Sequence, residues 1–229
     1  MIYHHGQNFG DTLNKYVFEG LYPGCWNHDE IEFWGIGSIL GLKTPQAETK
    51  KIFVFSSGYA PEMPGTYGAP PDLSDSRFDV RAVRGPISSS YLPRDKQTKQ
   101  FGDAGLLISE VVSPAMARSG VGLMPHISTE RRFPGIKHLC EELNIQYLSP
   151  SIEGDVGAKK ISGLDLLITE AMHGAIVADT YDIPRINVTF SRDINLHSGK
   201  TITKVFTPTH LTFITSGLPC FKMTRWTNS

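Results

Sequence analysis

The chain has 229 residues, of which 40% are hydrophobic and 20% charged, and its formal net charge is -1. That length can bury a full core, either as one large domain or as two smaller lobes. The near-neutral charge without a long basic block argues against a nucleic-acid partner, and no apolar run approaches the ~20 residues that span a bilayer.

The cysteines indicate the redox environment. Cys25, Cys140 and Cys220 are far apart and lack the paired spacing of a metal site. Reduced thiols in a cytosolic protein are the simplest account of such usage. The amino terminus also lacks the basic-then-apolar order of a signal peptide. We therefore expect a cytoplasmic protein without a bound metal, and peripheral contact with the inner face of a membrane stays open.

The first half of the chain alternates short apolar runs with turn residues. An apolar face predicts a helix over residues 11–21, with Asn8 or Asp11 available as its cap. The other expected elements are a glycine-rich turn at 35–40, a strand at 52–55, an irregular loop at 61–71, a strand at 79–83 and a helix opening at Gly85-Pro86.

The second half repeats this alternation more clearly. The predicted strands are 121–124, 145–148, 165–169 and 185–188. The predicted helices are 133–143, with Ile136, Leu139, Cys140 and Leu143 facing inward, 156–161, and one beginning near His173-Gly174. Strands separated by helices of ~10 residues imply parallel pairing with right-handed crossovers.

The predicted fold is therefore α/β, with two small doubly wound, Rossmann-like lobes. The lobes span residues 1–112 and 113–200. Residues 201–229 form a polar, threonine-rich tail, in which 210–215 is the best candidate strand.

The most informative segment runs from residue 165 to 179, where a branched apolar strand passes into a helix. Glu170, His173 and Gly174 stand where the carboxyl end of the strand meets the start of the helix. Open α/β sheets bind ligands at such crevices, and a helix start offers free N–H groups and partial positive charge to an anion. A histidine there can exchange a proton near neutral pH. We therefore predict an anionic ligand, with His173 as the main candidate residue.

Two further side chains are candidates for the same crevice. Arg84 precedes Gly85-Pro86 at a strand-to-helix switch, where a guanidinium can bind a carboxylate or phosphate through two hydrogen bonds. A solvated surface arginine is the alternative. His126 follows the strand at 121–124 and would face the same crevice. A hydrogen-bonded structural histidine is the alternative there.

Glycines and small polar residues suggest places where a ligand can approach the backbone. Asn8 and Gly10 precede or open a helix, so their role is capping alone or capping with ligand contact. Gly37 and Ser38 offer amides to a phosphate or sugar, although the segment lacks the third glycine of a dinucleotide fingerprint. The sequence contains no nucleophile elbow and no Walker loop.

Six segments, taken in order, resemble those of the polysaccharide pyruvyl transferases. They are Asn8-Phe9-Gly10-Asp11-Thr12-Leu13-Asn14, Gly35-Ile36-Gly37-Ser38-Ile39-Leu40, Val83-Arg84-Gly85-Pro86, Gly102-Asp103-Ala104-Gly105-Leu106-Leu107, Pro125-His126 and Glu170-Ala171-Met172-His173-Gly174-Ala175-Ile176. The similarity is closest to the branch that acts in bacterial exopolysaccharide synthesis, as in succinoglycan, and it covers about residues 6–188.

The resemblance implies a fold similar to the two-lobed GT-B glycosyltransferases, with the site in the interlobe cleft. Residues 1–112 would be the acceptor side and 113–200 the donor side. The implied reaction transfers a pyruvyl ketal group from phosphoenolpyruvate to a saccharide acceptor, expected to be lipid-linked, without a further cofactor. The implied donor site holds His173 and Arg84, with His126 as a third member.

Within this implied reaction we assign His173 as the acid and Glu170 as the residue that orients it. Asp11 or Asp103 would be the base toward the acceptor. Many family members carry an arginine at the position of Ala171, so a positive charge must come from elsewhere. Two alternatives remain open: a GT-B-type glycosyltransferase that uses a nucleotide sugar, and a non-catalytic saccharide-binding relative.

Overall fold

The computed structural model describes residues 8–25, 30–40, 46–59 and 72–190. Four sequence predictions fall wholly outside these residues. They are the loop at 61–71, the tail at 201–229, its candidate strand at 210–215 and the state of Cys220.

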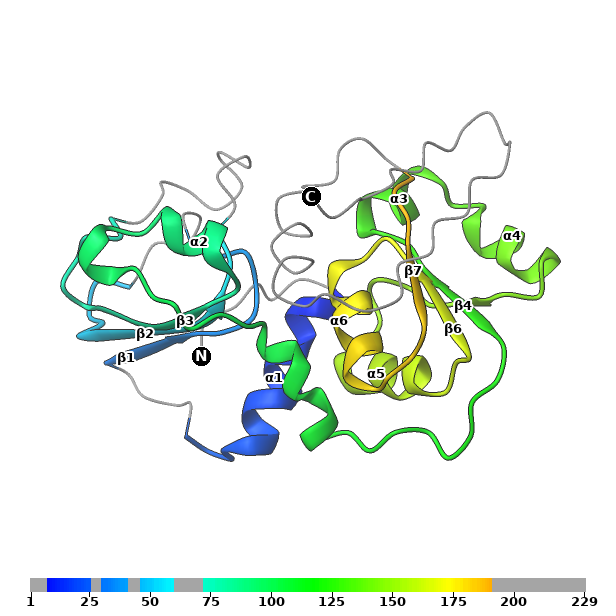
Figure 1. Cartoon of the computed structure of the whole chain (residues 1–229), viewed down its shortest axis with the longest axis horizontal. Coiled ribbons are helices and arrows are strands. Elements are labelled where there is room, and N and C mark those ends of the chain that lie inside the picture. Colours follow the sequence, from blue (N-terminus) through cyan, green and yellow to red (C-terminus); the bar gives the residue numbers. More distant parts are fainter. Residues whose placement is uncertain (1–7, 26–29, 41–45, 60–71, 191–229) are drawn as a thin grey trace.

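Helices and strands alternate along the described chain (Figure 1). The strands are β1 (Ile31–Trp34), β2 (Lys51–Ser57), β3 (Phe78–Val83), β4 (Val121–Met124), β5 (Gln146–Tyr147), β6 (Leu166–Thr169) and β7 (Arg185–Asn187). The α-helices are α1 (Phe9–Leu21), α2 (Pro86–Ser90), α3 (Ile127–Arg132), α4 (Ile136–Glu142), α5 (Gly154–Ser162) and α6 (Met172–Thr180). Two 3₁₀ helices, η1 (Arg94–Lys96) and η2 (Ala104–Glu110), complete the set among the described residues.

The strands form two separate parallel sheets. The first has the order β1-β2-β3 and the second the order β5-β4-β6-β7. Every pairing between these named strands is parallel. The predicted α/β class and parallel pairing are therefore confirmed. Figure 1 shows the two sheets at opposite ends of the molecule, with α1 and η2 between them.

Helix α1 connects the two halves through its apolar face. Leu13 and Val17 are fully buried in the core of the second half, where α1 packs against α5 and α6. Phe18, near the end of the helix, contacts Phe33 of β1 edge to face, with ring centroids 4.7 Å apart. Burying each such side chain contributes up to ~1.5–3 kcal/mol to stability. The first helix of the chain therefore holds the first sheet against the second half.

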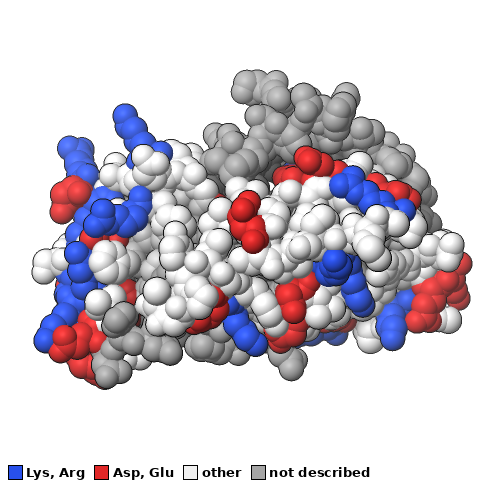
Figure 2. Space-filling model, turned by 90° about the horizontal axis from the view of Figure 1, so that it is seen from below, with Lys and Arg blue, Asp and Glu red and all other residues white. Residues whose placement is uncertain are grey.

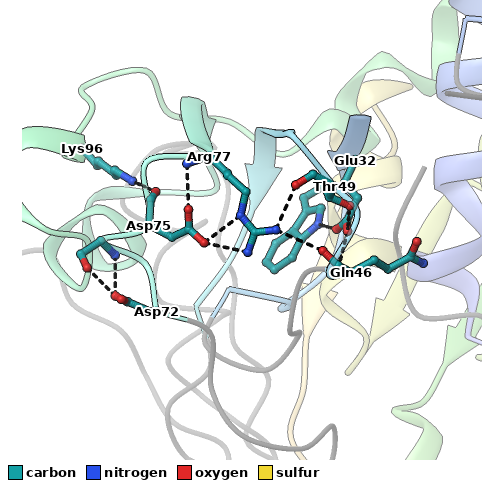
Figure 3. A network of polar contacts seen from close by, with 9 residues as sticks. Glu32, Gln46, Thr49, Asp72, Asp75, Arg77 and Lys96 are labelled. Carbon is teal, nitrogen blue, oxygen red and sulfur yellow. Dashed lines mark hydrogen bonds and ion pairs between the residues drawn. The ribbon is translucent and has the colours of Figure 1, made fainter. Parts of the chain in front are cut away.

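The first sheet has a smaller core of its own and a polar network at its edge (Figure 3). Arg77 pairs with Asp75 at 2.7 Å and donates to the carbonyl oxygens of Gln46 and Thr49. The Glu32 carboxylate accepts hydrogen bonds from the Gln46 amide at 2.7 Å and the Thr49 hydroxyl at 2.6 Å. These contacts fix the connection that leads into β2.

One helix differs from its prediction. A helix is predicted over residues 133–143, and α4 forms there but begins only at Ile136, after the separate helix α3 has ended at Arg132. Of its predicted inward side chains, Cys140 is buried, but Leu139 and Leu143 are 48% and 59% exposed. The prediction that these two leucines face inward was wrong, because α4 lies at the edge of the fold and contacts only β5 appreciably among the described elements.

Candidate active site

The candidate residues follow the carboxyl ends of strands in both sheets. Arg84 comes directly after β3, and its amide donates to the Ser57 carbonyl oxygen at 3.0 Å. His173 lies in the first turn of α6, so the predicted strand-to-helix switch is confirmed. His126 follows β4 and caps α3. Residues far apart in sequence are therefore presented from equivalent edges of two parallel sheets.

Arg84 is a buried side chain, only 2% exposed, which excludes a solvated surface arginine. Its Nε donates to Asp103 Oδ2 at 2.9 Å and its Nη1 donates to the Ser38 hydroxyl at 2.8 Å. A Cβ atom at Gly58 would lie 2.4 Å from Nη1, so the guanidinium rests on that glycine. The remaining nitrogen, Nη2, is buried and has no hydrogen-bond partner within the described chain.

Asp103 lies at the centre of the cluster. It caps η2, where its Oδ1 accepts from the Gly105 amide at 2.9 Å. Its Oδ2 faces both Arg84 and His173 Nε2, the latter at 3.4 Å. Burial alone would raise the pKa of this carboxyl, but His173, Arg84 and the Gly105 amide together hold the pKa well below its usual range. Asp103 is therefore ionised at neutral pH despite complete burial.

The His173 ring fits against the first turn of α1. Its side chain is 11% exposed, and a Cβ atom at Gly10 would lie 1.9 Å from Nδ1. Gly174 is equally constrained, because a Cβ there would lie 2.6 Å from the Thr169 hydroxyl oxygen. Gly10 thus permits a close approach, as its sequence position suggested, and the group that approaches it in this structure is the histidine ring.

Hydrogen bonds also join the segment at residues 8–14 to the segment at residues 35–40. Asn8 caps α1 by accepting from the Gly10 amide at 2.9 Å, which confirms the predicted cap. The buried Asn14 donates to the Ile36 carbonyl oxygen at 2.8 Å and accepts from the Ile36 amide at 2.7 Å. At Gly37 φ is +138°, a conformation that favours glycine.

Asp11 reaches the same region from α1. A Cβ atom at Gly37 would lie 3.6 Å from Asp11 Oδ1. Since Ser38 is hydrogen-bonded to Arg84, the predicted binding residues of both motifs lie around the Arg84 cluster.

Glu170 and His126 form a neighbouring contact. Glu170 accepts hydrogen bonds from the backbone amides of His126 at 3.0 Å and Phe190 at 2.6 Å. His126 Nδ1 lies 2.7 Å from the Ser128 hydroxyl. Burial lowers the pKa of His126, and the charge of Glu170 acts in the opposite sense. Glu170 thus holds the chain around His126, whereas the carboxylate placed against His173 is that of Asp103.

Sequence reasoning considered Asp103 only as a base toward the acceptor and did not link it to His173 and Arg84. The segment Gly102-Asp103-Ala104-Gly105 was among the recognised motifs, so the signal was present. Asn14 likewise ended a recognised motif without an assigned role. Both residues act by joining elements, and a single sequence does not show which elements meet.

A groove of about 930 Å³ lies between α1, the end of η2 and α5, and its lining contains none of the predicted site residues. Figure 2 shows acidic and basic side chains interspersed over one face of the molecule. Among the described residues, no three histidine, cysteine or acidic side chains gather as metal ligands. No helix in the described part of the chain is long and apolar enough to cross a membrane.

Sequence comparison identifies a curated relative. The chain is 30% identical over 196 residues to the succinoglycan biosynthesis protein ExoV of Rhizobium meliloti (strain 1021), and the alignment covers 83% of this chain. The chain spans 58% of the length of that relative. No family model matches the chain. At this identity and coverage, the chain belongs to the polysaccharide pyruvyl transferase family.

Proposed function

We propose that this chain carries the donor site of a pyruvyltransferase that moves a pyruvyl group from phosphoenolpyruvate to a saccharide during exopolysaccharide or cell-surface glycan synthesis. The observation that carries the proposal is a pair of buried side-chain nitrogens beside Asp103, one on Arg84 and one on His173. Arg84 Nη2 and His173 Nε2 are both enclosed and both without a hydrogen-bond partner within the described residues. Buried donors are nearly always satisfied, so two in one cluster favour an anionic ligand.

Phosphoenolpyruvate suits these donors because it carries a phosphate and a carboxylate. Arg84 would bind one of these groups through Nη2, since its other nitrogens are held by Asp103 and Ser38. His173 would lie near the enol carbon that receives a proton. The supporting geometry is that both side chains contact the same oxygen of Asp103.

The proposed reaction begins when His173, as imidazolium, protonates the methylene carbon of phosphoenolpyruvate. The adjacent carbon gains oxocarbenium character and is attacked by an acceptor hydroxyl, whose proton passes to a base. Phosphate then departs with its bridging oxygen, and a second hydroxyl attacks the same carbon to close the ketal. The two acceptor hydroxyls lose two protons. One of them restores the proton that His173 gave to the methylene carbon, and the other leaves with phosphate.

Asp11 is the proposed base, because it lies on α1 beside Gly37, which belongs to the proposed acceptor side. Gly37, Ser38 and Asn8 would contact the acceptor or the departing phosphate, and His126 would assist donor binding. We propose a lipid-linked acceptor at the cytoplasmic face of the membrane, as in the synthesis of other polymers assembled on lipid carriers.

The test is a phosphate-release assay with phosphoenolpyruvate and a panel of β-galactosides, β-glucosides and N-acetylhexosamines. We expect release that depends on the acceptor, together with a product whose mass has increased by one pyruvylidene group. His173→Gln should reduce turnover at least ~10²-fold while the protein remains folded, because glutamine cannot deliver a proton.

Two outcomes would contradict the proposal. Binding of a nucleoside diphosphate, without any effect of phosphoenolpyruvate on melting temperature, indicates a nucleotide-sugar glycosyltransferase. Saccharide binding without phosphate release from any acceptor indicates a non-catalytic relative.

A further inference from the structure

We propose that Asp103 is the positioning residue of this site: one buried carboxylate that favours the protonated His173 ring and directs the free nitrogen of Arg84 toward an anionic substrate. The identity of that substrate rests on the proposed function. The coupling between the three side chains can be tested without it.

The two carboxylate oxygens of Asp103 have different roles: one holds the local backbone and the other faces the site side chains. Oδ1 accepts from the Gly105 amide, which fixes the carboxylate at the start of η2. Oδ2 is left for the two cationic side chains, Arg84 at 2.9 Å and His173 at 3.4 Å. The side chain has no exposed surface, so water does not compete for either oxygen. Asp103 therefore holds both cationic groups from one fixed point.

The distance to His173 indicates an ion pair rather than a full hydrogen bond, because N–H···O bonds are typically 2.7–3.2 Å long. Catalytic hydrogen bonds are often long before the substrate binds and shorten in the complex. His173 is otherwise restrained by Gly10, which leaves no room for the ring to move toward α1. The ring therefore stays within 3.4 Å of the Asp103 carboxylate.

The charges of the cluster couple protonation to anion binding. Arg84 and Asp103 cancel, so the cluster is neutral with a neutral His173 ring and carries one positive charge when the ring is protonated. Opposite charges a few ångströms apart favour the charged form of both groups. Other titratable groups on the surrounding elements include Asp11 on α1, Glu170 before α6 and His126 after β4.

Arg84 is directed by the same carboxylate. Asp103 binds Nε and Ser38 binds Nη1, while Gly58 supports the guanidinium. The planar group then has a fixed orientation, and only Nη2 remains without a partner among the described residues. Without the Asp103 carboxylate, Ser38 would be the one remaining hydrogen-bond partner described here that orients the guanidinium.

The first measurement uses the ligand-free protein and needs no activity. Side-chain ¹⁵N shifts of His173, assigned with His173→Gln, report the protonated fraction of its ring at a fixed pH near neutrality. We expect a smaller protonated fraction in Asp103→Asn than in the wild type, because the ring has lost the carboxylate that lies 3.4 Å from its Nε2. His126 serves as an internal reference whose titration should stay unchanged.

The matched control is Asp179→Asn. Asp179 also pairs with a buried arginine, Arg185, at 2.6 and 2.9 Å, but this pair lies between α6 and β7. Both variants lose a carboxylate from an arginine pair, so both should lose stability. Only Asp103→Asn should change His173. An unchanged His173 titration in folded Asp103→Asn would overturn the proposal, as would an equal change in Asp179→Asn.

A reciprocal measurement keeps Asp103 in place should Asp103→Asn fail to fold. Carboxyl ¹³C shifts in His173→Gln should show Asp103 taking up its proton at a higher pH than in the wild type, because a cationic partner has been removed. An unaltered Asp103 titration in that variant also overturns the proposal.

The enzymatic measurement separates positioning from a purely structural role. With phosphoenolpyruvate and an active acceptor, kcat of Asp103→Asn should fall at least ~10-fold near neutral pH and recover in part at lower pH, where His173 is protonated again. A loss that acidification does not recover contradicts the proposal. If the wild type itself gives no turnover, the proposed function fails, and the two NMR measurements still decide the role of Asp103.

Discussion

Replacing Gly10 by alanine tests the placement of His173 most directly. A Cβ atom at this position would lie 1.9 Å from Nδ1, 2.5 Å from Cγ and 2.6 Å from Cε1 of the ring. Such distances are far inside van der Waals contact, so either the ring or α1 must move. Helix α1 is held by the hydrogen bond from the Phe9 amide to the Pro150 carbonyl oxygen at 2.8 Å and by the contacts of Asn14. The histidine ring should therefore be the group that moves.

Two opposing effects set the magnitude. Alanine in place of glycine in an unobstructed helix stabilises the folded state by up to ~1 kcal/mol. Inserting a methyl group into a filled space costs ~1–3 kcal/mol. We expect Gly10→Ala to lower the free energy of unfolding by up to ~2 kcal/mol. The effect on turnover should be larger, because displacing a reacting group by ~1 Å can cost ~10²-fold in rate.

The assay combines urea denaturation with the phosphate-release rate. Gly135→Ala is the matched control, because Gly135 has helical dihedral angles and a Cβ atom added there would meet no neighbouring atom within 4 Å. The control should keep wild-type turnover. If Gly10→Ala matched this control in both stability and rate, His173 would not rest on Gly10, and the packing of the ring against α1 would be wrong.

Arg84→Ala should lower the free energy of unfolding by ~3–5 kcal/mol, because it leaves the Asp103 charge buried with one partner fewer; Arg84→Lys should recover only part of this, since an ammonium cannot bind Asp103 and Ser38 in the same planar geometry. Near-wild-type urea stability of Arg84→Ala would contradict the buried pair. Burial lowers the folded-state pKa of His126 below 6.5, so the unfolded chain binds more protons and stability is lost as pH falls from 6.5 toward the folded value. His126→Gln should therefore lose less stability than the wild type between about pH 7 and pH 5, and equal losses in urea titrations would count against this account.

The elements that sequence predicted best are those with purely local signals. The strand at 121–124 and the start of α6 near His173 both agree with the structure, because a short apolar run and the residues that follow it suffice to define them. Strand β1 was not predicted. It contains Glu32, whose charge disguises a buried strand. That carboxylate is satisfied by the Trp34 indole at 2.6 Å and by groups more than ten residues away, which no local pattern reveals.

The helix at 133–143 shows the opposite failure. Its apolar spacing predicted an inward face, yet Leu139 and Leu143 remain about half exposed. Periodicity reports which side chains share a face and does not show whether another element covers that face. In the described structure α4 lies at the edge of the second sheet, beside its shortest strand, so little surface is available to cover the leucines.

For the candidate site, the sequence predicted individual residues but not the contacts between them. Arg84 and His173 were chosen because each follows a strand, and both lie in one cluster. The residue that joins them, Asp103, is 19 positions from Arg84 along the chain and caps a 3₁₀ helix that apolar periodicity does not predict. Its effect on His173 depends on α6 and η2 lying side by side, which is a consequence of tertiary packing.

The composition of this cluster is better explained by chemistry than by stability. A buried arginine–carboxylate pair contributes little net stability, because desolvation offsets much of the attraction. Each buried donor without a partner costs a further ~1–3 kcal/mol, and this cluster holds two within the described chain, Arg84 Nη2 and His173 Nε2. Arg185 also has one unpartnered nitrogen, but its two bonds to Asp179 bring no titratable second cation into the pair. What distinguishes Asp103 is that one ionised oxygen faces both a permanent cation and a group that can lose its proton. Apolar residues in place of this cluster would stabilise the fold equally well, so the arrangement is understandable if an anion binds the free Nη2 of Arg84 and a proton is then transferred.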